Sequence, residues 1–493
     1  MAVRAAGHRQ AWQRQALAAL GEVAGLTDAA APDGAELVLD LGDSPPAGTT
    51  TTVLAIRDED GLGPDHLGAG AVSRGRTSVV VRLIAIAPDG HGRILEEASL
   101  RLASWRWHEA RTALLETVAT WPARAVGREH AFPSGPAIAV SRRPALPPPA
   151  WRRRLGELRA LAGRATWRFF EDQWAIGIVD APVAFLLAAG ELPRQRVRWL
   201  APPPGGFVAD PMVVPDERGA CPTVLAELFL FREGRGKIVA LDTGSGAPPA
   251  TVLERPWHLS YPFLLRHGGE LYCLPEMFHA RRAQLFRADP FPSCWAEGPV
   301  LLEDFAAVDG TVHHDGERFW LFCANQDDEP EAKLFLFFSE DLFSGWKPHP
   351  GNPVRHDLRN SRPAGPLFAA DGALWRPAQD CTATYGGAVV VNRVLELTPT
   401  RFVEEAAIRL SPDPEGPWPD GLHTLCAAGP VTIVDGKRRF VMPLRGSMAT
   451  ARALWRKAGD VVAAWHRRRD GRGGDGGSHG QGGPVRSKPM RRP

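Results

Sequence analysis

The stretch Phe207-Val-Ala-Asp-Pro-Met-Val-Val214 is the first of five similar segments, each with a polar residue in or before an apolar run. The polar residues are Asp210, Tyr261, Asp309, Arg362 and His423, which lie 51, 48, 53 and 61 residues apart. Each segment is followed by a short turn, at 216–219, 267–269, 315–316, 371–372 and 435–436, and then by a second apolar run. Hairpins that repeat every ~40–50 residues are typical of propeller blades. The pattern predicts a mainly β chain with a five-bladed β-propeller over 171–450.

Other stretches divide the rest of the chain. Residues 1–131 predict a small α/β domain, with helices near 9–20 and 105–126 and strands near 35–42, 76–86 and 93–102. Residues 132–170 predict a Pro-rich linker and a basic helix, and 451–493 predict a helical end and a disordered Arg/Gly-rich tail. The apolar run 173–179 stands apart from the five repeats. We expect it to add an outer strand to the last blade and so close the ring, because an open ring leaves strand edges unprotected.

Charge and cysteine usage limit the function classes. Residues 201–450 hold 32 Asp/Glu and 23 Lys/Arg, a net charge of −9, which argues against nucleic acid as a ligand of the propeller. The six cysteines form no CxxC pair, which favours buried thiols in a reducing compartment. The longest apolar run, at 181–189, is too short to cross a membrane, and the first residues lack an apolar signal core. We therefore expect a cytoplasmic protein without a transmembrane segment.

The propeller topology predicts which polar residues meet. The inner strands of all blades begin at the same face near the axis, so Asp210, Tyr261, Asp309, Arg362 and His423 form an expected inner ring. The second strands return to that face and bring a second ring of Glu227, Glu276, Asn325, Gln379 and Asp380. Hydroxyl-rich ligands require donors and acceptors together, so this mixture indicates a saccharide site. Arg376 stands in the same segment as Gln379 and Asp380, and sequence leaves open whether it orients ligand or holds backbone.

Three motifs resemble the five-bladed glycoside hydrolases of family 43 and its clan. They are Ala209-Asp210-Pro211, Val308-Asp309-Gly310 and Gly421-Leu-His423. The resemblance implies that Asp210 is the base, that Asp309 tunes the pKa of the acid, and that His423 lies by a central ion, often calcium. No other cofactor is implied. The fourth blade departs from the family because Ser361-Arg362 stands where a general-acid Glu is expected, and an Arg cannot donate a proton at neutral pH. A hydrolase would have to use Glu276 or Asp380 as the acid.

A second resemblance is to the N-terminal propeller of the glucosamine inositolphosphorylceramide transferases and related bacterial proteins. It is carried over 172–445 by His258-Leu-Ser-Tyr-Pro-Phe263, Arg376-Pro-Ala-Gln-Asp-Cys381 and Gly421-Leu-His-Thr424, together with other short motifs. In that family glycosyl transfer belongs to a separate C-terminal domain, so the resemblance implies a glycan-related propeller and a partner glycosyltransferase. Residues 1–131 weakly resemble the hydrolase half of formyltransferases, without their catalytic Asn, His and Asp.

Two functions stay open at this point. In the first, the pocket binds a saccharide or sugar phosphate through Tyr261, Arg362, Arg376, Gln379, Asp380, Asn325 and His423. In the second, the protein is an active glycosidase or glycosyl-transferring enzyme that uses Asp210, Asp309 and either Glu276 or Asp380. The plainer alternative is that Asp210 and Asp309 only cap strand ends or bind Arg362 in a structural ion network.

Overall fold

The chain is mainly β. The computed structural model describes residues 2–4, 11–24, 37–40, 52–127, 137–139, 145–166, 169–213, 223–244 and 247–441. The predicted tail at 451–493, most of the 132–144 linker and the turn at 216–219 lie outside the described residues. Within the described residues, no helix combines the length and apolar character that a bilayer crossing requires.

The described residues before 140 contain one six-stranded sheet, in the order β1-β2-β3-β4-β5-β6. Its strands are β1 (Ala2–Arg4), β2 (Leu37–Asp40), β3 (Thr52–Asp58), β4 (Ser78–Ile86), β5 (His91–Arg101) and β6 (Ala137–Ala139). The first three strands pair in parallel and the remaining neighbours pair antiparallel. Strands β2, β4 and β5 cover the apolar runs near 35–42, 76–86 and 93–102, whereas β3 was not predicted.

The described α-helices all lie before residue 190, and two short 3-10 turns follow them. They are α1 (Ala11–Ala24), α2 (Ala69–Ser73), α3 (Trp107–Val118), α4 (Trp121–Gly127), α5 (Ala150–Thr166) and α6 (Val183–Ala189), with 3-10 turns η2 (Arg194–Arg196) and η3 (Phe278–Ala280). The single helix predicted over 105–126 is wrong, since the chain turns between α3 and α4. Pro122 lacks the N–H that would bond to the carbonyl of Val118, so one continuous helix is disfavoured.

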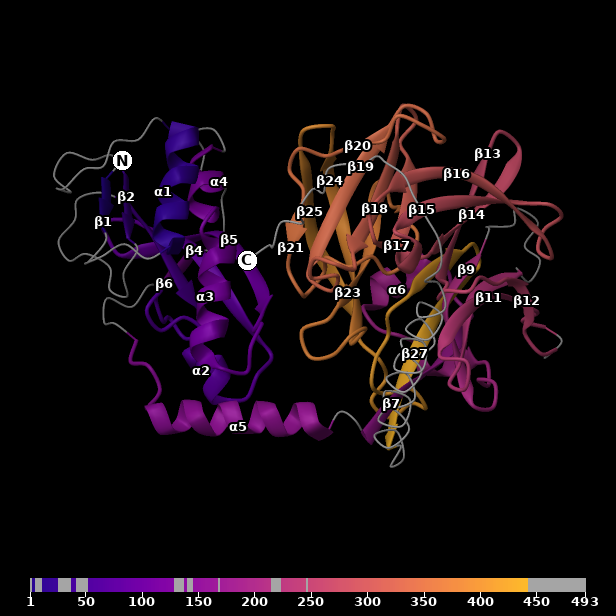
Figure 1. Cartoon of the computed structure of the whole chain (residues 1–493), viewed down its shortest axis with the longest axis horizontal. Coiled ribbons are helices and arrows are strands. Elements are labelled where there is room, and N and C mark those ends of the chain that lie inside the picture. Colours follow the sequence, from indigo (N-terminus) through magenta and orange to yellow (C-terminus); the bar gives the residue numbers. More distant parts are fainter. Residues whose placement is uncertain are drawn as a thin grey trace, which may run out of the picture. The chain divides into compact units, whose positions relative to one another are not determined.

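Five further sheets follow the repeats in order (Figure 1). The first holds β9 (Gly206–Val213), β10 (Val224–Leu230), β11 (Arg235–Leu241) and β12 (Ala250–Leu253). The second holds β13 (Ser260–His267), β14 (Glu270–Glu276), β15 (Arg282–Ala288) and β16 (Trp295–Glu303). The third holds β17 (Ala307–His314), β18 (Phe319–Asn325), β19 (Lys333–Ser339), β20 (Lys347–Pro348) and β21 (Arg355–His356). The fourth holds β22 (Phe368–Ala370), β23 (Ala373–Asp380), β24 (Ala388–Leu397) and β25 (Phe402–Leu410).

The fifth sheet joins strands from two distant parts of the sequence. Its order is β26 (Leu425–Ala428), β27 (Val431–Val441), β7 (Phe170–Val179) and β8 (Val197–Trp199). The expectation that the run 173–179 adds a strand to the last repeat is confirmed, because β7 lies between β27 and β8. Figure 1 shows β7 and β27 side by side, although about 250 residues of chain separate them.

Apolar clusters connect neighbouring sheets. One cluster joins the first three sheets through residues such as Met212, Leu274 and Leu321. A second joins the third sheet to the fourth, a third joins the fourth to the fifth, and a fourth joins the fifth back to the first. Each sheet therefore buries apolar side chains against the next sheet in cyclic order, and burial of this kind is the main stabilising force.

The turn predictions are mostly right. The described turns at 267–269, 315–316 and 371–372 do connect the first two strands of their sheets. The turn predicted at 435–436 is wrong, because both residues lie inside β27 and the hairpin instead turns at Gly429 and Pro430. Of the five cysteines that are described as free thiols, four are buried as expected, whereas Cys294 is exposed.

Candidate functional site: a buried acid cluster

The first three sheets share one irregularity in their innermost strands. Strand register shifts beside Asp210, Tyr261 and Asp309, and these residues have positive φ angles of 54°, 43° and 53°. A non-glycine residue in the left-handed region carries steric strain, and such strain clusters at functional sites. Bulges also redirect side chains away from the regular alternation of a strand. The repeats therefore place three strained residues at equivalent positions.

Each strained residue is held by a carboxylate from the preceding sheet. The amide N–H of Asp210 donates to Oδ2 of Asp435 (3.1 Å), and that of Tyr261 donates to Oδ2 of Asp210 (3.2 Å). The amide of Asp309 donates to Oε2 of Glu276 (3.2 Å). The five residues that make these contacts are all buried. The hydrogen bonds therefore offset part of the free-energy cost of removing their carboxyl groups from water.

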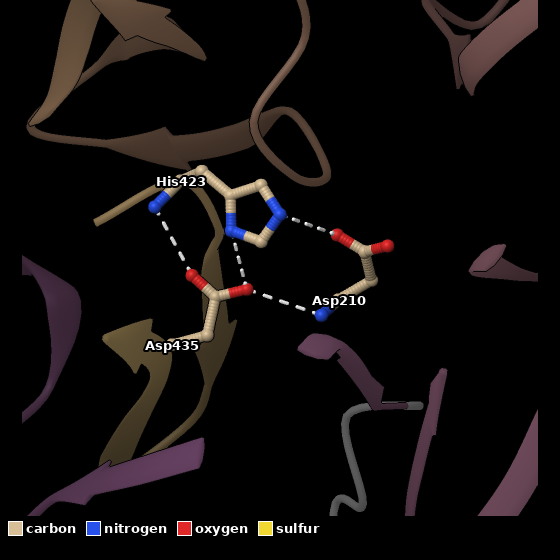
Figure 2. Close-up of side chains that lie close together, drawn as sticks. All are labelled: Asp210, His423 and Asp435. Atoms are coloured by element: carbon tan, nitrogen blue, oxygen red, sulfur yellow. Dashed lines mark hydrogen bonds and ion pairs between the residues drawn. The ribbon is translucent and has the colours of Figure 1, made fainter. Parts of the chain in front are cut away.

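His423 lies between two carboxylates (Figure 2). Its Nδ1 is 2.7 Å from Oδ2 of Asp435, and its Nε2 is 3.2 Å from Oδ1 of Asp210. Asp435 also accepts the backbone N–H groups of His423 (3.0 Å) and Thr424 (2.9 Å) through Oδ1. The imidazole stacks on Trp174, with ring centroids 3.8 Å apart. This arrangement fixes the ring and gives both nitrogens an anionic neighbour.

Burial and neighbouring charge shift the pKa values of this group. Burial opposes the charged imidazolium of His423, but the carboxylates of Asp435 and Asp210 outweigh that cost and raise its pKa. Burial raises the pKa of Asp210 to about 6, against the opposing effect of His423. The raised pKa of His423 favours the imidazolium form, whose two nitrogens face Asp435 and Asp210.

Arg362 organises the other half of the cluster. Its Nε donates to Oδ2 of Asp309 (2.5 Å), and its Nη2 is 3.9 Å from Oε2 of Glu276. The amide of Gln379 donates to the same Asp309 oxygen (3.1 Å). The guanidinium lies over the ring of Tyr385, 4.9 Å from its centroid. Arg362 is therefore paired with the Asp309 carboxylate already present, which weakens its attraction for an anionic ligand.

Two buried glutamates of the second ring have strongly raised pKa values. Burial raises the pKa of Glu276 well above its usual range, with Asp309 adding to the effect and Arg362 opposing it. Burial likewise raises the pKa of Glu227, and Asp210 and Glu276 add to it. Oε1 of Glu227 is buried and has no hydrogen-bond partner among the described residues. Both shifts favour the protonated form, in which a carboxyl group can donate a proton.

The donor set does not fit the central calcium ion that was expected. Ligand atoms of Asp210, His423 and Asp435 lie within 4.8 Å of one another, close enough to surround a metal ion. Calcium prefers six to eight oxygen ligands, however, whereas both His423 nitrogens face carboxylates and both Asp435 oxygens accept backbone N–H groups. The three residues form an internally paired triad.

Three predicted site residues make their hydrogen bonds outside the buried acid cluster. Arg376 binds Glu404 through two nitrogens (2.7 and 2.6 Å) and donates to the carbonyl of Asn360. Asp380 accepts from Arg409 (2.9 Å) and from its own turn. The Asn325 side chain accepts the N–H of Asp327 in a turn. These contacts support local backbone, whereas Asp210, Tyr261, Glu276, Asp309, Arg362, Gln379 and His423 are brought together.

Sequence reasoning missed Asp435, Trp174 and Tyr385 as members of the cluster. Asp435 was assigned to a turn, and Trp174 lies in β7, outside the repeats. The hydroxyl of Tyr261, which was expected to face ligand, instead accepts the N–H of Gly365 (2.7 Å) and bonds to Thr311 (2.9 Å). A repeat alignment that included the strand before the repeats would have identified Trp174.

Known proteins are similar to part of this chain. Residues 235–414 match the family model for glucosamine inositolphosphorylceramide transferase 1, N-terminal. The enzyme of that name from Oryza sativa subsp. japonica is 29% identical over 285 residues, which cover 53% of this chain and 36% of the relative. The Arabidopsis thaliana enzyme is 30% identical over 217 residues, covering 41% of this chain and 27% of the relative. The resemblance inferred from the motifs is confirmed, and the chain spans about a third of the length of these relatives.

Solved structures of glycoside hydrolases are also similar, at low identity. An exo-beta-1,3-galactanase from Clostridium thermocellum has a TM-score of 0.33 and 9% identity, covering 43% of this chain and 54% of the other. A family 117 glycoside hydrolase produced by Zobellia galactanivorans has a TM-score of 0.32 and 12% identity, covering 47% of this chain and 85% of the other.

Proposed function

We propose that this chain is a glycan-related protein whose five sheets are the blades of a five-bladed propeller, and that the buried acid cluster recognises a saccharide. Support for the propeller comes from the cyclic packing of the sheets and from the equivalent positions of the three strained residues. Support for a glycan role comes from the similarity to the N-terminal part of a glycosyl-transferring family. A partner glycosyltransferase and a cytoplasmic location belong to the same proposal.

One observation carries the site. Carboxylates, a guanidinium, an imidazole and an amide come from all five sheets and meet in one buried network. Such a network offers donors and acceptors at short range, which is the requirement for binding several hydroxyl groups. Between the two ligand classes left open by the sequence, the pairing of Arg362 with Asp309 favours a neutral or weakly charged sugar over a sugar phosphate.

A titration of the full chain tests the proposal. Calorimetry with hexosamines, uronic acids, inositol phosphates and nucleotide sugars is expected to find one binding class. Asp210→Asn should weaken it tenfold or more, because a hydrogen bond to a charged group contributes ~1.5–3 kcal/mol. Asp380→Asn is the matched control, since that carboxylate lies in the fourth sheet but bonds to Arg409 instead. Absence of binding by the whole panel would contradict the proposal.

A second function is favoured by the raised pKa of Glu276. A glycosidase or glycosyl-transferring enzyme needs one carboxyl with a raised pKa and one ionised carboxylate. Burial raises the pKa of Glu276, and the charge of nearby Asp210 adds to that shift, so these two carboxyl groups are the candidates for the two roles. Slow heat from turnover, lost in both Glu276→Gln and Asp210→Asn, would make the protein an enzyme. Binding heat alone, without turnover, would leave recognition as its function.

A further inference from the structure

A cavity of about 170 Å³ lies apart from the acid cluster, since none of the cluster's side chains lines it. It is formed by the segment that follows α6 and by the loop before β26. Most of its wall is apolar and includes Leu192, Val197, Trp199, Pro412, Pro417 and Trp418. Neither the family resemblance nor the repeats assigns a role to these residues.

Two indoles give this cavity its shape. The rings of Trp199 and Trp418 are 6.2 Å apart between centroids and are tilted by 49°. Trp199 lies over two glycines, since a Cβ on Gly177 would approach its ring to 2.8 Å and one on Gly436 to 2.5 Å. Because both positions are glycine, the indole of Trp199 can occupy the space next to them. An indole presents a flat, electron-rich face that attracts weakly polarised C–H groups.

Charged groups stand at the rim of the cavity. Arg194 binds Asp413 through two nitrogens, one of them at 2.6 Å from Oδ1, and its Nη2 is 3.0 Å from Glu415. Arg194 is about half exposed, so this ion pair faces solvent and is accessible to a ligand. With one cation and two carboxylates the rim has a net charge of −1. It therefore repels phosphates and uronates while still offering donors and acceptors.

We propose that this cavity binds one ring of a neutral hexopyranose glycan. The C–H face of the sugar lies on Trp418 and Trp199, and its hydroxyl groups pair with Asp413 and Arg194. The volume is about six times the ~30 Å³ share of one water molecule, which matches a single sugar ring better than a drug-sized ligand. The site is separate from the acid cluster, so the protein would hold a glycan at two places.

Titration of the full chain with methyl glucoside, methyl galactoside and methyl mannoside, followed by saturation-transfer NMR and calorimetry, tests this site. Trp418→Ala is expected to weaken binding at least tenfold, and Asp413→Asn about tenfold. The matched control is Trp151→Ala, because Trp151 is 62% exposed on α5 and does not line the cavity. It should bind as the wild type does. Glucose 6-phosphate should bind more weakly than the methyl glycosides.

Several results would overturn the proposal. They are absence of glycoside binding, equal binding by Asp413→Asn and wild type, and loss of binding in Asp210→Asn, which would assign the sugar to the acid cluster. Binding of a Pro-rich peptide in place of glycosides would also overturn it, since aromatic clefts recognise such peptides too. Trp418 is 91% buried, so if Trp418→Ala fails to fold, Asp413→Asn at the rim decides.

Discussion

At the scale of single residues, Asp435 supports the cluster through several buried contacts. It is fully buried, accepts three backbone N–H groups and faces His423. Asp435→Asn removes the negative charge and places an NH₂ group among donors. We expect this variant to lose ~3–5 kcal/mol of unfolding free energy, as when one partner of a buried ion pair is removed. Denaturant unfolding monitored by circular dichroism measures the loss.

Asp435 also makes the stability of the folded chain depend on pH, because it raises the pKa of His423. The pKa of His423 is raised above 6.5 in the folded chain, so its contribution to stability is complete below pH 6.5 and is lost as the pH rises through the folded pKa. We expect the unfolding free energy of the wild type to fall over this range, and to fall less in Asp435→Asn. Asp413→Asn is the control, because Asp413 also loses an ion pair, but with Arg194, which stays charged over this pH range. An equal pH slope in wild type and Asp435→Asn would contradict the pairing.

At the scale of elements, β7 and β8 depend on a glycine. A Cβ on Gly177 would lie 2.8 Å from the Trp199 ring and 3.0 Å from Val197. Gly177→Ala is therefore expected to destabilise the protein by ~1–3 kcal/mol through overpacking. Gly163→Ala in α5 is the opposite case, since a Cβ there has no atom within 4 Å, and helix propensity should add ~0.5–1 kcal/mol. Thermal melts of both variants should shift in opposite directions.

Sequence predicted the elements whose signals are local and missed those decided by distant packing. Asp210, Tyr261 and Asp309 did mark buried strands, whereas Arg362 and His423 lie in the segments just before β22 and β26. The apolar run around Trp174 did mark β7. Asp435-Gly436 has the composition of a hairpin turn but lies within β27. The cause is tertiary, because Trp199 and Trp418 occupy the space where a Cβ on Gly436 would lie. For the same reason the bonds of Arg376 to Glu404 could not be read from the segment that contains it.

At the scale of the whole molecule, β7 joins the start of the five-sheet region to its end. It lies between β27 and β8 in the fifth sheet, so without it β27 would expose an open edge and β8 would lose its partner. The fifth sheet shares apolar clusters with both the fourth and the first, so disorder in it would expose core on two sides. We therefore expect the stability of distant repeats to depend on this one ten-residue strand.

Two truncated chains test whether the sheets after residue 181 fold without β7. A chain that begins at residue 168 retains β7 and is expected to unfold cooperatively on heating. A chain that begins at residue 181 lacks β7 and should show no cooperative transition, since the lost strand removes the buried side chains of Trp174, Ile176 and Val179. Circular dichroism melts of the two proteins measure the difference. If both chains melt cooperatively at the same temperature, β7 is dispensable and the ring is closed by other contacts.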